Sequence, residues 1–286
     1  MIWPKNDSNP NCDYDNLWSS NTFCEINHFK EFLLPLNITI EQKTPNNLYG
    51  NIDILGYSSN FYNENQIQKI VNKFKPKILI HTSDEKGDRP KHNDITGVNI
   101  ILRQYNWYNY NNKPHIYQLP LGYHCWDNGN ILPIVPIYNR KYIFSFIGTP
   151  KGKREEQANE LKKNFNRFFV GKTTPNQNKY IYNQTIFAFC PKGNIVYNYH
   201  RNYIAMKNGC IPIIILDKKI YNEQFSNILG GPPPFIYKST SNELIKEMKR
   251  LLNNKDELDN LSKLQIKWYN NNIKTIQSII KQNLLD

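Results

Sequence analysis

The stretch IFAFCPKGNIVYNYHRNYIAMKNGCIPIII, from Ile186 to Ile215, combines two kinds of sequence. It begins and ends with apolar runs, IFAFC and CIPIII, which are typical of buried β-strands. Between them lie a polar and aromatic loop and the segment NYHRNYIAMKNG. We interpret this segment as a helix that ends at Gly209, because glycine is common directly after a helix. The stretch therefore predicts strand, loop, helix and strand, the repeating unit of an α/β fold.

The same order of elements surrounds this stretch in the second half of the chain. We expect strands in YIFSFIGTP and FFVGK, with an amphipathic helix in KREEQANELKKNF between them. The segment QNKYIYNQT is expected to be helix or loop. SNELIKEMKRLLNN and DELDNLSKLQIKWYNNNIKTIQSIIKQNLL are expected to close the chain as helices.

The first half of the chain repeats this pattern. NIDILGYSS predicts a strand, and NENQIQKIVNKFKP predicts a helix that stops at Pro76. KILIHTSDE, VNIILRQYNW and HIYQLPLGYH predict short buried strands, whose unbroken Ile, Leu and Val runs favour a parallel sheet covered on both faces.

The segment NGNILPIVPIYNRKY contains two prolines and few regular signals, so we interpret it as a linker. It divides the chain into two expected Rossmann-like domains, residues 1–130 and 131–286. Whether the last helix crosses back to the first domain is left open. In such folds a ligand binds at the carboxyl ends of the strands, here in a cleft between the domains.

The composition is that of a folded, basic protein. The chain has 286 residues, of which 39% are hydrophobic, and its formal net charge is +12. Such a charge favours nucleic acid, a membrane surface or a phosphorylated small molecule as partner. The lysines and arginines are spread along the chain without a block of five or six, so charge alone does not choose among these partners.

The cysteines and the apolar runs exclude several classes of protein. The five cysteines include no CxxC pair, which argues against a disulfide framework or a zinc site. The first residues show no signal-peptide pattern, and no run of about eighteen apolar residues could span a bilayer. We therefore expect a soluble, cytoplasmic protein without a membrane span.

The loop after IFAFC is the strongest candidate for a binding site. CPKG ends a strand and NYHR opens a helix, so free backbone N–H groups and the helix dipole would form an anion site. Arg201 would bind a phosphate, although it could instead be an ordinary surface arginine. Lys192 and Gly193 belong to this loop, and Gly148 and Arg154 occupy a second strand-to-helix junction, GTPKGKR. Each glycine is either a turn residue or a point of close approach to the ligand.

Three ordered motifs resemble those of the exostosin-like glycosyltransferases. FCPKG…R…A…GCIPII is similar to the family's Pro-x-Gly loop, arginine, alanine and Gly-Cys-Ile-Pro signature, and FSFIGTPKGKR is similar to its phenylalanine-rich strand with a following arginine. HTSDEKGDR…ILRQYNW…YQLPLGY resembles the N-terminal half of soluble members, including those of large DNA viruses. The likeness covers roughly residues 75 to 216.

The resemblance implies a GT-B fold, with a nucleotide-sugar on the C-terminal domain and the acceptor on the N-terminal domain. It also implies inverting transfer without a metal ion or other cofactor, and a UDP-linked donor. Two positions depart from the family pattern: Ile204 replaces a glutamate, and Tyr199 replaces a serine. Either the donor contacts are altered, or the contacts to the donor's hydroxyl groups come from Tyr199, Asn198 or a later acid such as Asp217.

Asp84 and Glu85 follow an apolar strand and are the candidates for the catalytic base. Inverting transfer needs a group that takes the proton of the attacking hydroxyl. We favour Glu85 because its side chain is longer, whereas either acid could simply cap the loop. Arg103 is expected to pair with one of them or to form a second positive wall. The weaker base candidates are His81, His124 and His200.

These observations together predict an inverting glycosyltransferase that acts on a glycan or glycoprotein. A basic nucleic-acid-binding protein is the alternative from another class, and it is less favoured because the distinctive residues gather at strand ends. A sugar-nucleotide binder without activity is a third possibility, because Ile204 occupies the glutamate position.

Overall fold

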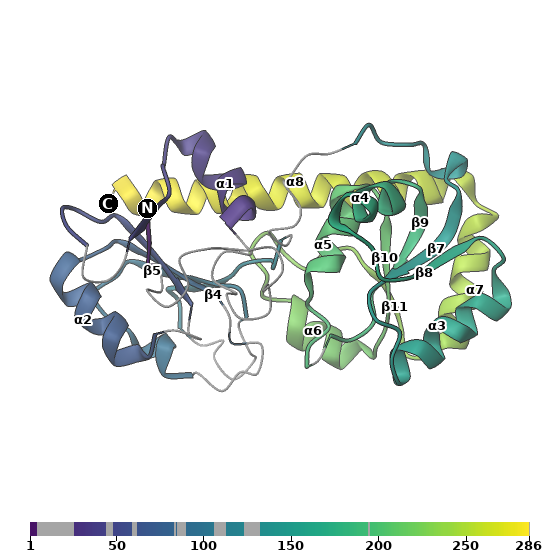
Figure 1. Ribbon diagram of the computed structural model, residues 1–286, viewed down its shortest axis with the longest axis horizontal. Coiled ribbons are helices and arrows are strands. Elements are labelled where there is room, and N and C mark those ends of the chain that lie inside the picture. Colours follow the sequence, from purple (N-terminus) through teal and green to yellow (C-terminus); the bar gives the residue numbers. More distant parts are fainter. Residues whose placement is uncertain are drawn as a thin grey trace. The chain divides into compact units, whose positions relative to one another are not determined.

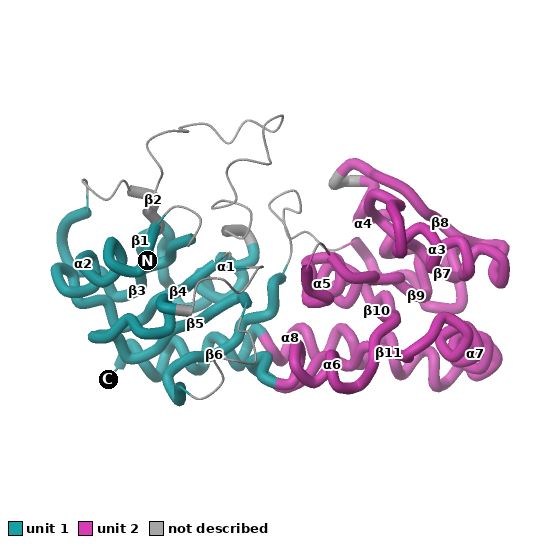
Figure 2. The backbone as a smooth tube through the Cα atoms, turned by 90° about the horizontal axis from the view of Figure 1, so that it is seen from below, with its two compact units in different colours: residues 1–125, 227–230, 273–286 teal, residues 126–226, 231–272 magenta. Residues whose placement is uncertain are grey.

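The structure is a computed structural model of the chain. It describes residues 1–4, 26–43, 48–58, 62–82, 84, 90–105, 113–122, 132–193 and 195–285. The chain forms two compact units (Figure 2). Unit 1 contains residues 1–125, 227–230 and 273–286, and unit 2 contains residues 126–226 and 231–272. The long helix α8 (Lys255–Leu285) therefore begins in unit 2 and ends in unit 1.

Unit 2 is built on a five-stranded parallel sheet with the order β11-β10-β9-β7-β8. Its strands are β7 (Tyr142–Ile147), β8 (Phe168–Gly171), β9 (Thr185–Phe189), β10 (Ile211–Ile215) and β11 (Ile236–Lys238). The first four confirm the strand predictions, and β11 had not been predicted. Because β8 and β9 lie on opposite sides of β7, the winding of the chain reverses between β7 and β9. Open α/β sheets bind ligands at such a reversal.

Helices cover both faces of this sheet (Figure 1). α3 (Lys153–Asn164) and α7 (Ser241–Leu252) pack against each other and against one face. α4 (Pro175–Asn183) and α5 (His200–Lys207) lie together on the other face. α6 (Lys218–Phe225) contacts β11. A short 3-10 helix, η6 (Ile137–Asn139), precedes β7. The main core contains the phenylalanines of β7 and β9 with isoleucines of β10: Phe144, Phe146, Phe187, Phe189, Ile211, Ile213 and Ile215.

The C-terminal end of α5 is held by a buried arginine. Arg140 donates hydrogen bonds to the carbonyl oxygens of Thr185, Gly209 and Asn208 at 2.7, 3.0 and 3.3 Å. Gly209 follows the helix with φ +68°, which confirms its predicted place after the last turn. The positive guanidinium also opposes the negative end of the helix dipole.

Unit 1 contains a six-stranded parallel sheet with the order β2-β1-β3-β4-β5-β6. The strands are β1 (Ile2–Pro4), β2 (Glu41–Lys43), β3 (Ile54–Ser58), β4 (Ile78–Thr82), β5 (Ile100–Arg103) and β6 (Ile116–Gln118). β3 to β6 confirm the predicted strands, although each is shorter than predicted. β1 and β2 were not predicted, and neither were α1 (Ile26–Leu33) and the 3-10 helix η2 (Leu34–Leu36).

Alternate residues of these strands enter two separate cores. Leu55, Leu79 and Ile101 face α2 (Glu64–Phe74), which ends before Pro76 as predicted. The 3-10 helix η4 (Pro90–Asp94) is followed by Ile95, which is buried in the same core. The opposite core contains apolar residues of α1 and of the last part of α8 (Figure 1). In the part of the chain that the structure describes, no helix has the length and apolar character to cross a membrane.

Candidate functional site

The winding reversal of unit 2 brings together several of the predicted binding residues. Gly148 follows β7, and Pro191 and Gly193 follow β9. Arg201 lies in the first turn of α5, where its Nη1 donates to the carbonyl oxygen of Pro191 at 3.0 Å. Its Nη2 lies 3.5 Å from the place that a Cβ on Gly148 would occupy. The two strand-to-helix junctions therefore meet at one guanidinium.

Aromatic rings fix the plane of the Arg201 guanidinium. Its central carbon lies 4.7 Å from the ring centroid of Tyr199 and 5.4 Å from that of Phe146. The side chain is only 8% exposed, and the described residues offer it no carboxylate. A buried charge without a counter-charge is unfavourable. The cluster formed by Gly148, Gly193, Tyr199 and Arg201 is therefore suited to an anion.

Both glycines of this cluster are required by their surroundings. Gly148 has φ +153°, and a Cβ there would meet the Phe146 ring at 3.3 Å. A Cβ on Gly193 would lie 3.0 Å from the Tyr199 ring and from the carbonyl oxygen of Val196. The glycines thus allow close packing around Arg201.

The segment before α5 is held by the side chains of Gln224 and Tyr203, whose roles were not predicted from the sequence. The Oε1 of Gln224, on α6, accepts hydrogen bonds from the backbone N–H groups of Tyr197 and Asn198 at 2.7 and 3.3 Å. The Tyr203 hydroxyl donates to Oδ1 of Asn198 at 2.6 Å. No motif marks Gln224 or Tyr203, because their roles depend on how α5 and α6 pack.

The other predicted residues of this region differ in burial. Lys192 is exposed, and Arg154 is half-buried in the first turn of α3. Asp217, the alternative acid, caps α6 by accepting a hydrogen bond from the backbone N–H of Ile220 at 2.9 Å. Burial, and secondarily the Asp217 carboxylate, raise the pKa of the Tyr197 hydroxyl.

A row of polar side chains crosses the carboxyl edge of the unit 1 sheet. Tyr57, His81, Arg103 and Gln118 are in register on β3, β4, β5 and β6. All are buried. Arg103 forms an ion pair with Asp84 and also donates to Oδ1 of Asn93. Pairing with Asp84 was one of the two roles predicted for Arg103.

The histidines of this region belong to an aromatic stack. The rings of Tyr57 and His81 are 4.8 Å apart and nearly parallel, and the His92 ring packs against both, 4.8 Å from His81 and 5.6 Å from Tyr57. The Tyr57 hydroxyl lies 3.3 Å from Nδ1 of His92. Burial raises the pKa of this hydroxyl above its ordinary value. Because His81 is fully buried within the stack, its position indicates a packing role.

The candidate base pair requires one correction. β4 ends at Thr82, and Asp84 follows with φ +105°, so the strand stops before the end of the predicted stretch KILIHTSDE. The carboxylate of Asp84 is buried against Arg103. Taking up a proton there would leave a buried guanidinium unpaired, which makes Asp84 a poor base. Glu85 and His124 lie outside the described residues, and His200 is buried beside Tyr199.

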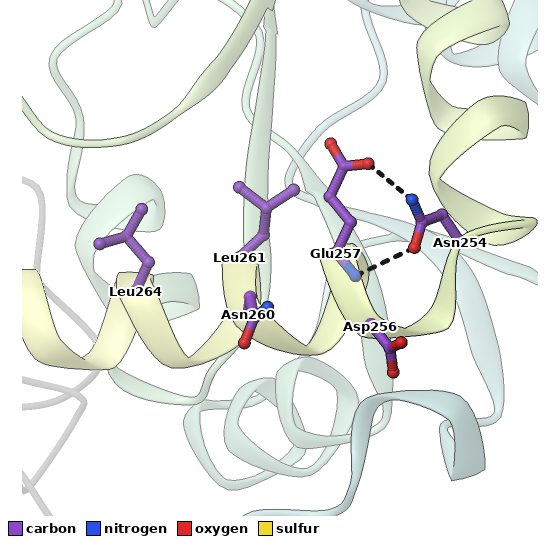
Figure 3. Close-up of a pocket in the computed structure, with 6 residues that line it drawn as sticks. All are labelled: Asn254, Asp256, Glu257, Asn260, Leu261 and Leu264. Atoms are coloured by element: carbon purple, nitrogen blue, oxygen red, sulfur yellow. Dashed lines mark hydrogen bonds between the residues drawn. The ribbon is translucent and has the colours of Figure 1, made fainter.

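A surface hollow of about 540 Å³ lies at the start of α8 (Figure 3). Asn254 caps the helix there: its side chain accepts from the backbone N–H of Glu257 and donates to the Glu257 carboxylate. Two acidic residues, Asp256 and Glu257, line the hollow, so it is unsuited to a phosphate. Among the described residues, no group of three or more His, Cys, Asp and Glu side chains could hold a metal ion.

Solved structures of low sequence identity share this architecture. A DNA-modifying β-glucosyltransferase, determined with and without its substrate uridine diphosphoglucose, is 14% identical over 99% of both chains, with a TM-score of 0.55. The T4 phage enzyme BGT in complex with its substrate UDP-glucose is 15% identical over 99% of this chain and 98% of that one, with a TM-score of 0.51. Accessory secretory proteins of Streptococcus pneumoniae match at 12% identity and a TM-score of 0.51, over 83% of this chain and 53% of that one.

Sequence comparison adds nothing to this likeness: no known family profile matches the chain, and no curated protein sequence does. At these identities the structural likeness establishes the fold alone. Together with the two parallel sheets, it shows that the chain has a two-domain, Rossmann-like GT-B fold.

Proposed function

We propose that the protein is an inverting glycosyltransferase that transfers a sugar from a UDP-linked donor to a hydroxyl group. The observation that carries this proposal is Arg201, a buried guanidinium without a carboxylate partner among the described residues, placed where the sheet of unit 2 reverses its winding. The likeness to two solved structures of β-glucosyltransferase that have UDP-glucose as substrate supports the same donor class, and so do the exostosin-like motifs.

In this proposal, unit 2 stabilises the departing diphosphate. Glycosyl transfer leaves negative charge on the phosphate oxygens, and Arg201 would neutralise part of it. Because Tyr199, Phe146 and the Pro191 carbonyl already fix the guanidinium, little reorganisation is needed as charge develops. The first N–H groups of α5 would add a favourable dipole. Neutralisation by these groups is consistent with transfer that needs no metal ion.

Unit 1 would supply the acceptor site and the base. Glu85 remains the proposed base, because the pairing of Asp84 with Arg103 favours a structural role for Asp84. We propose a glycan or glycoprotein as acceptor. A nucleic acid is the second candidate acceptor, favoured by the net charge of +12 and by the likeness to a DNA-modifying enzyme.

Calorimetric titration with UDP-glucose and UDP tests the donor site. Replacing Arg201→Ala removes a charge-assisted contact worth about 1.5–3 kcal/mol, so affinity should fall by about 10- to 150-fold. Arg250→Ala is the matched control, because Arg250 is a half-exposed arginine of unit 2 that pairs with Glu247 and Glu257 on the surface. Unchanged affinity in Arg201→Ala would remove Arg201 from the site, and absence of binding by the unaltered protein to any UDP-sugar would refute the proposed donor.

A further inference from the structure

The amide of Asn198 is buried in the segment that leads into α5, three residues before Arg201, and is held in one orientation. Its side chain is 3% exposed, and its Oδ1 accepts the Tyr203 hydroxyl at 2.6 Å. Tyr203 is itself fully buried, with its ring stacked against Trp268 and edge-on to Phe235. Packing therefore fixes the hydroxyl, and the hydroxyl fixes the amide.

This orientation leaves the amide nitrogen of Asn198 available. Within the described part of the chain, no acceptor is found for Nδ2, although the atom is buried. Buried donors in folded proteins nearly always have a partner. Because Oδ1 is already used, the unfilled position requires a hydrogen-bond acceptor, such as an oxygen of a ligand.

The backbone around Asn198 is equally fixed. Gln224 accepts from the N–H groups of Tyr197 and Asn198, and the amide of Asn202 donates to the Tyr197 carbonyl at 2.8 Å. Contacts from α5 and α6 thus hold this segment. Tyr199, the next residue, contacts both Arg201 and Gly193. The Asn198 amide therefore belongs to the same rigid segment as the cationic cluster.

We propose that Asn198 donates a hydrogen bond from Nδ2 to an oxygen of the nucleoside diphosphate, and that Tyr203 is the positioning residue that orients it. This inference rests on the proposed function, since it names a second contact in the same donor site. Nothing in the motif likeness assigns a role to Tyr203. The hydroxyl acts through Asn198 and does not touch the ligand.

Calorimetry with UDP and with UDP-glucose tests this assignment. Asn198→Ala should weaken both ligands by a similar factor of about 3 to 15, the range of one hydrogen bond. Tyr203→Phe, which removes only the hydroxyl, should weaken them to a comparable or smaller extent. Tyr221→Phe is the matched control: the Tyr221 hydroxyl, also in unit 2, donates to the Pro233 carbonyl, and its loss should leave affinity unchanged.

The double variant Asn198→Ala/Tyr203→Phe tests whether Tyr203 affects UDP binding by orienting Asn198 or by a general loss of stability. If Tyr203 acts through Asn198, adding Tyr203→Phe to Asn198→Ala should weaken UDP no further. Asn198→Asp keeps an acceptor for Tyr203 but replaces the donor by a carboxylate, so it should weaken UDP more than Asn198→Ala does.

Several results would overturn the inference. These are full UDP affinity in Asn198→Asp, additive losses in the double variant, an equal loss in Tyr221→Phe, or a loss confined to UDP-glucose. If the unaltered protein bound neither ligand, the proposed function itself would fail, and that outcome is distinct from these.

Discussion

The three buried arginines in the described part of the chain have three different kinds of surroundings. Arg103 pairs with a carboxylate, Arg140 donates to backbone carbonyls, and Arg201 lies between aromatic rings with one carbonyl. A guanidinium stays charged at any pH at which the protein is folded, so its partners indicate its role. The described partners of Arg103 and Arg140 account for structural roles. The described partners of Arg201 include no negatively charged group, so its charge has no counter-charge. This favours a role in binding an anionic ligand.

The two acids after β4 should respond differently to substitution. Asp84→Asn leaves Arg103 without a counter-charge in a buried site, and breaking such a pair costs about 3–5 kcal/mol of stability. Glu85→Gln should instead reduce turnover by about 10²–10⁴-fold, the usual contribution of a general base, with donor affinity nearly intact. Urea unfolding and initial rates of UDP release measure the two effects.

Opposite results would reverse the assignment. A folded Asp84→Asn protein without transfer activity, beside an active Glu85→Gln protein, would make Asp84 the base. Near-normal transfer by both variants would place the base elsewhere, with His124 as the next residue to replace.

At the scale of secondary structure, α5 is fixed at both ends. Gln224 ties the segment before it, and Arg140 binds the carbonyls that end it. The helix carries Arg201, so its position sets that of the guanidinium. Gly209 is required at the second end, because a Cβ there would lie 3.0 Å from Nη2 of Arg140 and 3.2 Å from Ile266.

Gly209→Ala should therefore destabilise the protein by two separate effects. The residue has φ +68°, which strains any side chain, and the added methyl displaces Arg140. We expect a loss of about 1–3 kcal/mol in the free energy of unfolding by urea. Gly231→Ala is the control, since Gly231 has φ +90° with nothing within 4 Å of the added Cβ. Equal losses in both variants would show that the contact with Arg140 adds nothing beyond strain.

The elements that could be predicted are those marked by a pattern within their own residues, such as an apolar run or a terminating proline or glycine. Long Ile-rich runs predicted β4, β5 and β10, and Pro76 and Gly209 marked the ends of α2 and α5. β1, β2 and β11 span three residues each, which is too short for a periodic pattern. β6 is equally short, but the longer stretch HIYQLPLGYH around it predicted a strand. The cluster at Arg201 was predictable because the carboxyl ends of neighbouring parallel strands share one edge. The contacts of Tyr203 and Gln224 were not, because they depend on how α5 and α6 pack.

At the scale of the whole molecule, strand order determines where the candidate site lies. Alternating strands and helices predicted two parallel sheets, and both are present. The position of the winding reversal, between β7 and β9, does not follow from the pattern, because hydrophobic runs do not specify which strands are neighbours. The reversal makes β7 and β9 neighbours, so Gly148 and Gly193 follow adjacent strand ends although they are 45 positions apart in the sequence.

Affinity for DNA distinguishes the two candidate acceptors of this chain, whose net charge is +12. If the positive field serves a small diphosphate, random-sequence DNA should bind only through non-specific phosphate contacts. Its Kd would then be about 10⁻⁴–10⁻⁶ M at physiological salt and would weaken steeply as salt is added. Fluorescence anisotropy with labelled DNA at two salt concentrations measures this, and Arg201→Ala is a control that should leave DNA affinity nearly unchanged. A nanomolar complex at physiological salt, together with DNA-stimulated release of UDP from UDP-glucose, would instead favour a nucleic-acid acceptor, because an enzyme that modifies DNA must retain it long enough for transfer.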